Sequence, residues 1–455
     1  LAPVFVVTDF NNSASITTPG ALLITLRLFL RPIGEPNMKQ NGHAPRVVVT
    51  GIGAVSPLGH TWPETWAALK AGTSAGRRLT RFDPSDYPTQ FACSVVDFDP
   101  SKYMDFKEAK RLGAVTHFAW AATQEAIVHS GLDLKQEDLE RVGLEMGSAF
   151  GALDILEEQV LVLYNDGSRR IKPTLAPAVL ISTTPAYASI QLGITGPIDS
   201  RMSACATGIT SLGEAARKLQ RGEVDVMVAG GTDSFQTPVM MVSFSRLGAM
   251  STRNDDPATA CRPFCNTRDG MILGEGATMM VVETLEHAQA RGATILAEIT
   301  GWALTSDAYN MAAPDPSGKG AARAMKLAMR EAQITGEDID YICAHGTGTR
   351  LNDSSETVAI KAALGEAAYD TRISSIKSMV GHMMGAAGAI SAAALVSAIQ
   401  DNIVPPTINY HEPDPECDLH YVPNQAEARQ VDAAMCNAFG FGGQNASMVI
   451  ERFVE

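Results

Sequence analysis

The segment RVVVTGIGAV (residues 46–55) has the composition of a buried strand that ends in a glycine turn. The segment ILAEITGWAL (residues 295–304) has the same form, with an apolar, β-branched run followed by Thr-Gly and further apolar residues. Two such openings indicate an internal duplication with a boundary near residue 294. We therefore expect an N-terminal half over residues 38–293 and a C-terminal half over residues 294–455.

Strand-like and helical patterns alternate along both halves. Strand-like runs that end at glycines occupy residues 141–151, 224–234 and 339–349, and helical patterns occupy residues 107–131, 320–334 and 355–366. Alternation of this kind predicts an α/β fold with mostly parallel sheets covered by helices.

The first 37 residues differ from the rest of the chain. Their apolar run ALLITLRLFL (residues 21–30) is too short to span a bilayer and lacks the basic region of a signal peptide. The first methionine, Met38, precedes the first strand-like run. We expect residues 1–37 to be an extension outside the fold, with a short docking helix as the alternative.

Composition narrows the classes of protein. The chain has 455 residues, 45% of them hydrophobic, and carries a net charge of −14, which argues against a general nucleic-acid binder. Seven cysteines, an odd number in a long chain, favour a reducing, cytoplasmic compartment. Cys261 and Cys265 lack the companion ligands of a zinc site, so no metal is expected there.

One cysteine has the setting of a nucleophile. In SACATGIT (residues 203–210), Cys205 follows a strand-like run, residues 192–204, and precedes a helical pattern that ends at Gly222. Free N–H groups and the helix dipole at such a position favour a thiolate. A strand, a tight turn, a nucleophile and a helix form a nucleophile-elbow arrangement. The alternative is that Cys205 is a small, inert core residue.

Three further segments place polar residues in glycine-rich loops. AHGTGTR (residues 344–350) carries His345, SSIKSMVGHMMGAAGA (residues 374–389) carries Lys377 and His382, and NAFGFGGQNASMVI (residues 437–450) contains a glycine-rich turn. Each histidine taken alone is more often structural than catalytic, and the glycines alone indicate turns.

Together, SACATG, HGTGT, KSMVGHMMGAAGA and FGFGG, in this order, resemble the β-ketoacyl-acyl-carrier-protein synthases. The similarity is to the elongating synthase II type and its polyketide relatives, and it extends over about residues 45–453. It implies the thiolase fold, with two duplicated halves in a five-layer αβαβα arrangement, and a dimer. It also implies decarboxylative Claisen condensation of a cysteine-bound acyl chain with malonyl-acyl-carrier protein, in fatty-acid elongation.

The resemblance also implies roles for individual residues. Cys205 would carry the acyl chain, with the backbone N–H groups of Cys205 and Phe441 as the oxyanion hole and Phe441 as a gate. His345 and His382 would stabilise the malonyl enolate, and Lys377 would hold the charge network around His345. The remaining roles are a structural acid, Glu356, and contacts to the phosphopantetheine arm, Thr347 and Thr349. The arm is carried by the substrate, so no metal or other cofactor is implied.

Five positions depart from the family's usual pattern. Ser391 stands where a glutamate usually faces the lysine, and Asn310 and Ala312 stand where a histidine and a threonine are common. The other two departures are Arg350 in place of a common proline, as in polyketide ketosynthases, and Gln444 in place of a common threonine.

Two further expectations concern the carrier protein and the acyl chain. The family docks its acidic carrier at positions that match Lys107, Lys110, Arg111, Arg169 and Arg170, although charged runs are usually solvated helix faces. Phe150 stands where a smaller aliphatic residue commonly lines the end of the acyl pocket, so we expect it to shorten that pocket, with Phe244 as a wall.

Several alternatives remain open at the level of sequence. A degradative thiolase would need a second catalytic cysteine in the C-terminal loop, a non-enzymatic chain-length factor would lack Cys205, and a cysteine hydrolase would release an acid. The motifs leave open a ketosynthase of a type II polyketide system, paired with a chain-length factor. They also leave open whether the dimer partner is identical.

Overall fold

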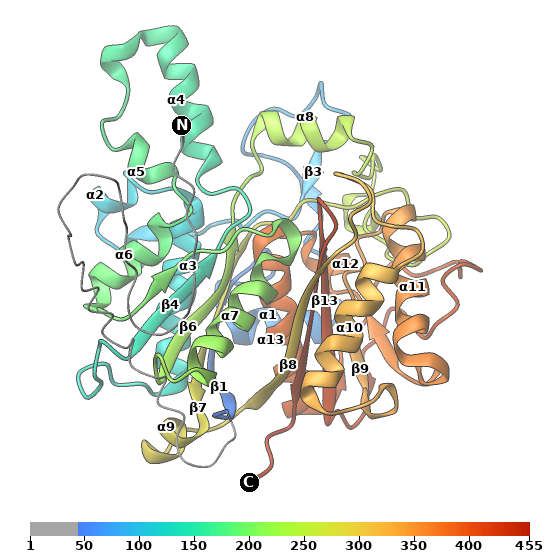
Figure 1. The fold of residues 1–455 in the computed structure, drawn as a ribbon. Coiled ribbons are helices and arrows are strands. Elements are labelled where there is room, and N and C mark those ends of the chain that lie inside the picture. The colour runs from blue at the N-terminus through green and yellow to red at the C-terminus, as the bar shows by residue number, and fades with distance from the viewer. Residues whose placement is uncertain (1–43) are drawn as a thin grey trace, which may run out of the picture. The chain divides into compact units, whose positions relative to one another are not determined.

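A mixed ten-stranded sheet organises residues 44–455, the part of the chain that the computed structural model describes (Figure 1). The predictions for residues 1–37 lie outside these residues. The strands of the sheet are β1 (Val47–Val55), β4 (Val142–Gly147), β5 (Ile198–Asp199), β6 (Val226–Asp233), β7 (Gly276–Thr284), β8 (Ala297–Ser306), β9 (Tyr341–Cys343), β10 (Arg372–Ser374), β13 (Ala433–Gly440) and β14 (Gln444–Glu451). Two short pairs lie outside it: β2 (Arg77–Arg78) with β3 (Phe91–Ala92), and β11 (Ile403–Val404) with β12 (Glu427–Ala428).

The sheet repeats one topology twice. Its order is β10-β9-β13-β14-β8 and then β1-β7-β6-β4-β5, so in each half the order from the outer edge is third, second, fourth, fifth and first strand. The pairings match as well: the outer three strands of each half are parallel, and the fifth strand is antiparallel to both its neighbours. The two first strands, β1 and β8, pair antiparallel and join the halves.

The prediction of mostly parallel sheets was wrong. Antiparallel pairs make up the centre of the sheet, from β6 and β7 through β1 and β8 to β14 and β13. Parallel neighbours need a long crossover, whereas antiparallel neighbours need only a tight turn, such as the one between β13 and β14. Apolar runs in the sequence indicate strands but do not give their direction.

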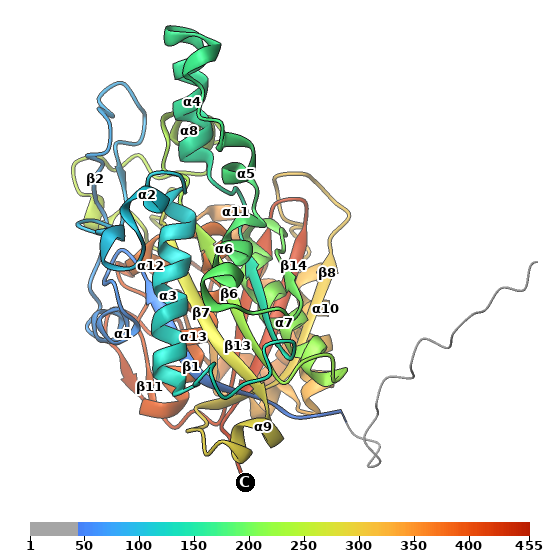
Figure 2. The same ribbon diagram turned by 90° about the vertical axis from the view of Figure 1, so that its left-hand side faces the viewer.

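Helices complete five layers, which confirms the predicted αβαβα arrangement (Figures 1 and 2). Helices α3 and α6 cover the outer face of the first half, α10 and α11 cover the outer face of the second, and α7 and α13 lie between the two halves. The α-helices are α1 (Trp62–Lys70), α2 (Phe106–Ala109), α3 (Ala114–Ser130), α4 (Leu153–Asp166), α5 (Leu175–Val179), α6 (Thr183–Leu192), α7 (Thr207–Gln220), α8 (Pro238–Arg246), α9 (Leu285–Ala290), α10 (Lys319–Ala332), α11 (Arg350–Leu364), α12 (Lys377–Val380) and α13 (Ala387–Asp401). Short 3-10 turns are η1 (Pro100–Lys102), η2 (Ser168–Arg170), η3 (Ala204–Ala206), η4 (Pro257–Thr259), η5 (Gly336–Asp338), η6 (Gly365–Tyr369) and η7 (Met384–Ala386).

The two central helices approach each other closely. A Cβ at Gly208 on α7 would lie 2.4 Å from the backbone nitrogen of Ala389 on α13, so only glycine permits this crossing. The crossing brings the N-terminal ends of α7 and α13 together. The stretch Met384–Asp401, which includes α13, is long and apolar enough to cross a membrane, but 89% of it is buried in the core between the two halves of the sheet.

Two sequence predictions of local structure need correction. The helix expected over residues 107–131 is two helices, α2 and α3, separated at Gly113, whose extended backbone caps α3. The strand expected before Cys205 is reduced to β5, because α6 extends to Leu192 and a left-handed Gly193 ends it. Glycine at a helix boundary interrupts a helical pattern that side-chain periodicity alone would continue.

Candidate active site

The proposed nucleophile lies in a strained turn at the N-terminal end of α7. Cys205 is the middle residue of η3, and the preceding Ala204 has a φ of +49°, a conformation that side chains with a Cβ rarely adopt. The Cys205 side chain is buried, with 4% of its surface exposed. A Cβ at Gly440, the last residue of β13, would lie 2.8 Å from the carbonyl oxygen of Ser203. Glycine at position 440 therefore lets β13 reach the nucleophile turn.

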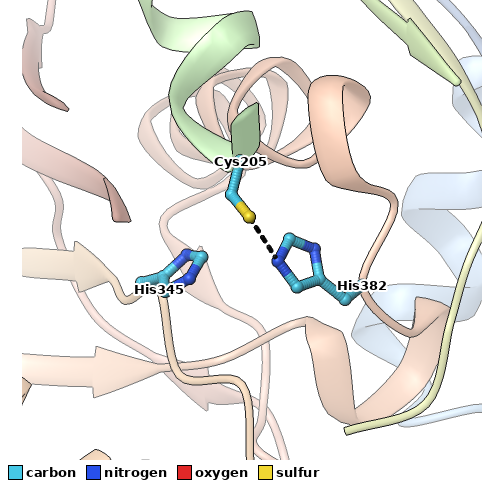
Figure 3. Close-up of side chains that lie close together, drawn as sticks. All are labelled: Cys205, His345 and His382. Atoms are coloured by element: carbon cyan, nitrogen blue, oxygen red, sulfur yellow. Dashed lines mark hydrogen bonds between the residues drawn. The ribbon is translucent and has the colours of Figure 1, made fainter. Parts of the chain in front are cut away.

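Two histidines from separate loops face Cys205 (Figure 3). His382 follows α12 and its Nε2 lies 3.1 Å from Cys205 Sγ, while His345 follows β9 and its ring centre lies 5.2 Å from that of His382. The backbone N–H of Met384 donates to Nδ1 of His382 at 3.1 Å. In a neutral ring this places the proton on Nε2, which then points at the sulfur as a donor.

Burial holds all three of these groups in their neutral forms. It raises the pKa of Cys205 to about 11, although the charge of Lys377 and the amides of Phe441 and Cys205 act in the opposite direction. Burial, together with the positive charge of Lys377, holds the pKa of His345 and of His382 well below the usual value. The thiolate predicted from the helix N-terminus is therefore not the resting state, because desolvation outweighs the favourable charges.

A buried carboxylate fixes the loop that carries His345. Glu356 on α11 accepts hydrogen bonds from the backbone N–H groups of His345 and Gly346, both at 2.7 Å. Burial raises the pKa of Glu356 to about 7, against the effect of these two amides. The ring of His345 itself retains an unpartnered, buried Nδ1. Glu356 thus orients the loop backbone and leaves the imidazole open to a ligand.

Lys377 lies beside the site among thiols and Glu356. Burial lowers the pKa of this lysine, while Cys343, Glu356 and Cys205 raise it. Within residues 44–455 no carboxylate lies within ion-pair distance of its amine. Ser391 on α13 hydrogen-bonds the Cys343 thiol, an interaction that lowers the pKa of that thiol against the effect of burial. The serine at this departure from the family pattern therefore contacts a thiol next to the lysine.

A cavity of about 510 Å³ leads from the surface to Cys205. His345, His382 and Met384 line it near the cysteine, and Phe441 and the neighbouring glycines line the side of the β13–β14 turn. The cavity wall also includes Thr347 and Thr349, whose hydroxyl oxygens lie 2.9 Å apart, and three positions noted as departures: Asn310, Ala312 and Arg350. Gln444, the remaining departure, contacts the Phe441 carbonyl oxygen at 3.5 Å and so braces the expected gate.

The two residues expected to form the acyl pocket belong to the same hydrophobic cluster as Cys205. Phe150 packs on Phe235, with ring centres 5.1 Å apart, and on Phe244 at 6.3 Å, and Phe244 stacks on Phe441 at 6.0 Å. Neither Phe150 nor Phe244 is among the residues that line the 510 Å³ cavity. Phe441, which does line the cavity, connects it to the rings of Phe244 and Phe150.

The structure separates the expected docking residues into two groups. Lys107, Lys110 and Arg111 are exposed on and just after α2, where the Lys110 amine lies 4.2 Å above the exposed Phe106 ring. Arg169 and Arg170 are exposed in η2, which follows α4, and Figures 1 and 2 show the far end of α4 projecting away from α2. One chain therefore presents two basic groups instead of one patch.

Sequence reasoning missed one feature near the nucleophile. Met384 Sδ lies 3.8 Å from Cys205 Sγ, and its position two residues after His382 was the only signal available. The donor atoms of Cys205, His345 and His382, which the sequence motifs assign to one site, lie within 4.8 Å of one another, a set that suits a metal ion as well as an organic substrate. A second missed feature is Cys265, where hydrogen bonds from Thr267 and backbone amides outweigh burial and lower the pKa of the thiol.

Comparison with known proteins agrees with this arrangement. The model of the family described as "Beta-ketoacyl synthase, N-terminal domain" matches residues 44–288, and that of its C-terminal domain matches residues 296–411. A 3-oxoacyl-[acyl-carrier-protein] synthase 2 from Coxiella burnetii is 44% identical over 90% of this chain and 98% of the relative. A protein of the same name from Staphylococcus aureus (strain COL) is 43% identical, with the same coverage.

Solved structures show the same fold. The ishigamide ketosynthase/chain length factor is 34% identical with a TM-score of 0.85, and a β-ketoacyl synthase from Burkholderia phymatum is 36% identical with a TM-score of 0.83. A type II polyketide ketosynthase, bound to its acyl-carrier protein, is 31% identical with a TM-score of 0.84. Each covers 90% of this chain and is itself covered completely. The matched domains and the paired histidines facing Cys205 have one explanation: the chain belongs to the β-ketoacyl synthase family, a family of acyltransferases.

Proposed function

We propose that this protein is a β-ketoacyl-acyl-carrier-protein synthase that extends acyl chains in fatty-acid synthesis. The observation that carries the proposal is the approach of two neutral histidines, His345 and His382, to a buried cysteine at the end of a cavity. Relatives named 3-oxoacyl-[acyl-carrier-protein] synthase 2, matched over nearly their whole length, support the same reaction.

The first step transfers the acyl group to Cys205. The sulfur attacks the carbonyl carbon of the acyl-carrier thioester, a new C–S bond forms, and the bond to the carrier sulfur breaks. The proton of the Cys205 thiol passes to the departing carrier thiolate. The amides of Phe441 and Cys205 already act on the sulfur, and in the same place they would bind the oxyanion of the tetrahedral intermediate.

The second step removes CO2 from the malonyl group. The thioester carbonyl accepts hydrogen bonds from the Nε2–H of His382 and a ring N–H of His345. When the bond to the carboxylate breaks, its electron pair moves onto the carbonyl oxygen and forms an enolate. Neutral imidazoles suit this step, because their N–H groups stabilise the developing charge without giving up a proton.

The third step forms the carbon–carbon bond. The enolate carbon attacks the acyl carbonyl on Cys205, the oxyanion again lies at the two amides, and the C–S bond then breaks. Cys205 leaves as a thiolate and is reprotonated, as its raised pKa favours. No step needs a metal or a redox cofactor, so activity should survive treatment with a strong chelator.

A malonyl-carrier assay that follows CO2 and product together tests the proposal. The wild type should release one CO2 for each β-ketoacyl product, and His382→Ala should lose both by about two to three orders of magnitude. Product without CO2, or release of a free acid in place of a β-ketoacyl thioester, would contradict it. The second outcome would indicate a hydrolase, and cleavage of β-ketoacyl thioesters by free thiol would indicate a thiolase.

Fatty-acid elongation is favoured over polyketide synthesis by sequence similarity. The curated synthase 2 relatives are 43–44% identical, whereas the solved type II polyketide ketosynthase bound to its acyl-carrier protein is 31% identical. To distinguish the two, the enzyme is given only malonyl-carrier and a saturated acyl-carrier, and the number of condensations per acyl chain is measured. A single condensation supports elongation, and repeated condensation without reduction would support the polyketide alternative.

Partners and compartment form the last part of the proposal. The carrier protein would dock at the exposed lysines and arginines of α2 and η2, and a second copy of this chain would pair with the exposed β5 edge and α4. A cytoplasmic location accords with seven free, buried cysteines.

A further inference from the structure

The segment HGTGTRL (residues 345–351) runs from the floor of the cavity to its rim. His345 and Thr347 are buried, with 3% and 5% of their surfaces exposed, Thr349 is half-buried, and Leu351 is 63% exposed. All four residues and Arg350 line the cavity. A ligand lying along this wall therefore has its reacting end near Cys205 and its other end beside Arg350.

Arg350 is the only lysine or arginine that lines the cavity within residues 44–455. The two acidic lining residues are already engaged: Asp269 pairs with Arg253 at 3.4 Å, and Asp307 accepts the side-chain amide of Asn445 at 2.7 Å. The guanidinium of Arg350 makes no hydrogen bond or ion pair with any residue that the structure describes. Its charge contributes to the low pKa of Asp414, but that carboxylate is bound by Arg268.

Within the part of the chain that the structure describes, the cavity wall thus holds one cation without an ion-pair partner, Arg350, and two acidic side chains that already have partners. Leu247 and Leu351 are exposed there, and the threonine hydroxyls lie below them. This arrangement fits a ligand with a neutral, polar arm and a single anionic group at its outer end. The planar guanidinium of arginine matches phosphate oxygens and can donate two parallel hydrogen bonds to them.

We propose that Arg350 binds the phosphodiester of the carrier's phosphopantetheine arm and thereby sets how deeply the arm enters the cavity. The proposal rests on the proposed function, which supplies the arm. It gives a role to the arginine that departs from the family pattern. The phosphate would remain at the solvent-exposed rim, where its desolvation cost is small, while the neutral arm passes the threonines.

Two stable compounds test the proposal without requiring turnover. One is S-methyl-pantetheine, and the other is the same compound carrying a methyl phosphodiester, so they differ by one monoanionic phosphate. Their dissociation constants are measured from protection of Cys205 against iodoacetamide. The wild type should bind the phosphorylated compound about three- to tenfold more tightly, a preference that falls with added salt.

The variants make the result specific. Arg350→Ala should remove the preference, Arg350→Lys should keep part of it, and Arg330→Ala, at an exposed arginine of α10 away from the cavity, should keep all of it. A preference that survives in Arg350→Ala would overturn the proposal, as would the absence of protection by either compound. So would a loss confined to carrier-bound substrate, because Arg350 would then contact the carrier protein itself. If the wild type prefers the phosphorylated compound but fails the malonyl-carrier condensation assay, the proposed reaction is overturned and the role of Arg350 in binding is not.

Discussion

At the scale of single residues, Phe150 makes the clearest prediction about substrate choice. Its ring packs against Phe235 and Phe244 in the hydrophobic cluster that includes Cys205, and overpacking such a site costs about 1–3 kcal/mol. Phe150→Ala should therefore raise kcat/KM about tenfold for the longest acyl chains and leave short chains unchanged. The measurement is kcat/KM for a series of carrier-bound acyl chains of increasing length, with Phe453→Ala as a control. Equal maximum lengths in wild type and Phe150→Ala would show that Phe150 does not limit the chain.

Glu356 predicts a pH dependence of stability. Its pKa is raised to about 7 in the folded protein from an ordinary value near 4.5, so its contribution is fully present below pH 4.5 and is lost as pH rises through 7. Glu356→Gln removes this titration. The Tm of the variant minus that of the wild type should rise between pH 5 and pH 8, whatever its offset at pH 5. A flat or falling difference across this range would contradict the raised pKa.

The chemistry of the site could be predicted from sequence, but its protonation could not. Cys205, His345, His382 and Lys377 lie in recognisable motifs, and the structure brings them together. The expected thiolate was wrong because the burial that raises the pKa of Cys205 depends on residues far away in the chain, such as Met384, whose Sδ lies 3.8 Å from the Cys205 sulfur. A local rule about helix ends omits that desolvation.

At the scale of elements, the basic residues on and just after α2 predict how strongly carrier docking affects the KM for carrier-bound substrates. Charge reversal of Lys110 and Arg111 to glutamate should raise KM for carrier-bound substrates about tenfold, since docking charges act on encounter and affinity. Alkylation of Cys205 should be unaffected. The matched control is Lys326→Glu at an exposed position of α10. Unchanged kinetics with carrier-bound substrate would place docking elsewhere, with η2 as the next candidate.

The periodicity of apolar residues in the sequence predicted the helices and strands of the core, but it did not predict where they are interrupted. The strands β1 and β8 lie almost where the sequence predicts them. The break between α2 and α3 and the shortness of β5 depend on glycines whose backbone angles are set by packing. Strand direction depends on the length of each connection across the fold, which a local pattern does not contain.

At the scale of the whole molecule, an apolar face predicts a dimer. Ile198 on the outermost strand, β5, is exposed, and so are apolar side chains along α4: Leu156, Val160, Leu161, Leu163 and Tyr164. An unpaired strand edge and a helix with several exposed apolar residues are both typical of surfaces covered by a partner. Replacing Val160 and Leu161 by lysine should raise the dimer dissociation constant at least about 100-fold. Native mass spectrometry measures this, with Val454→Lys as a control. Dimers that persist unchanged in the double variant would exclude this face.

The central claim, that Cys205 carries the growing chain, is tested most directly by intact-protein and peptide mass spectrometry. After incubation with acyl-carrier protein, the wild type should gain the mass of one acyl group on the peptide containing Cys205. Addition of malonyl-carrier should remove that mass as β-ketoacyl product appears, and Cys205→Ala should show neither event. Acylation mapped to another cysteine, such as Cys265 with its lowered pKa, or β-ketoacyl product from Cys205→Ala, would contradict the account.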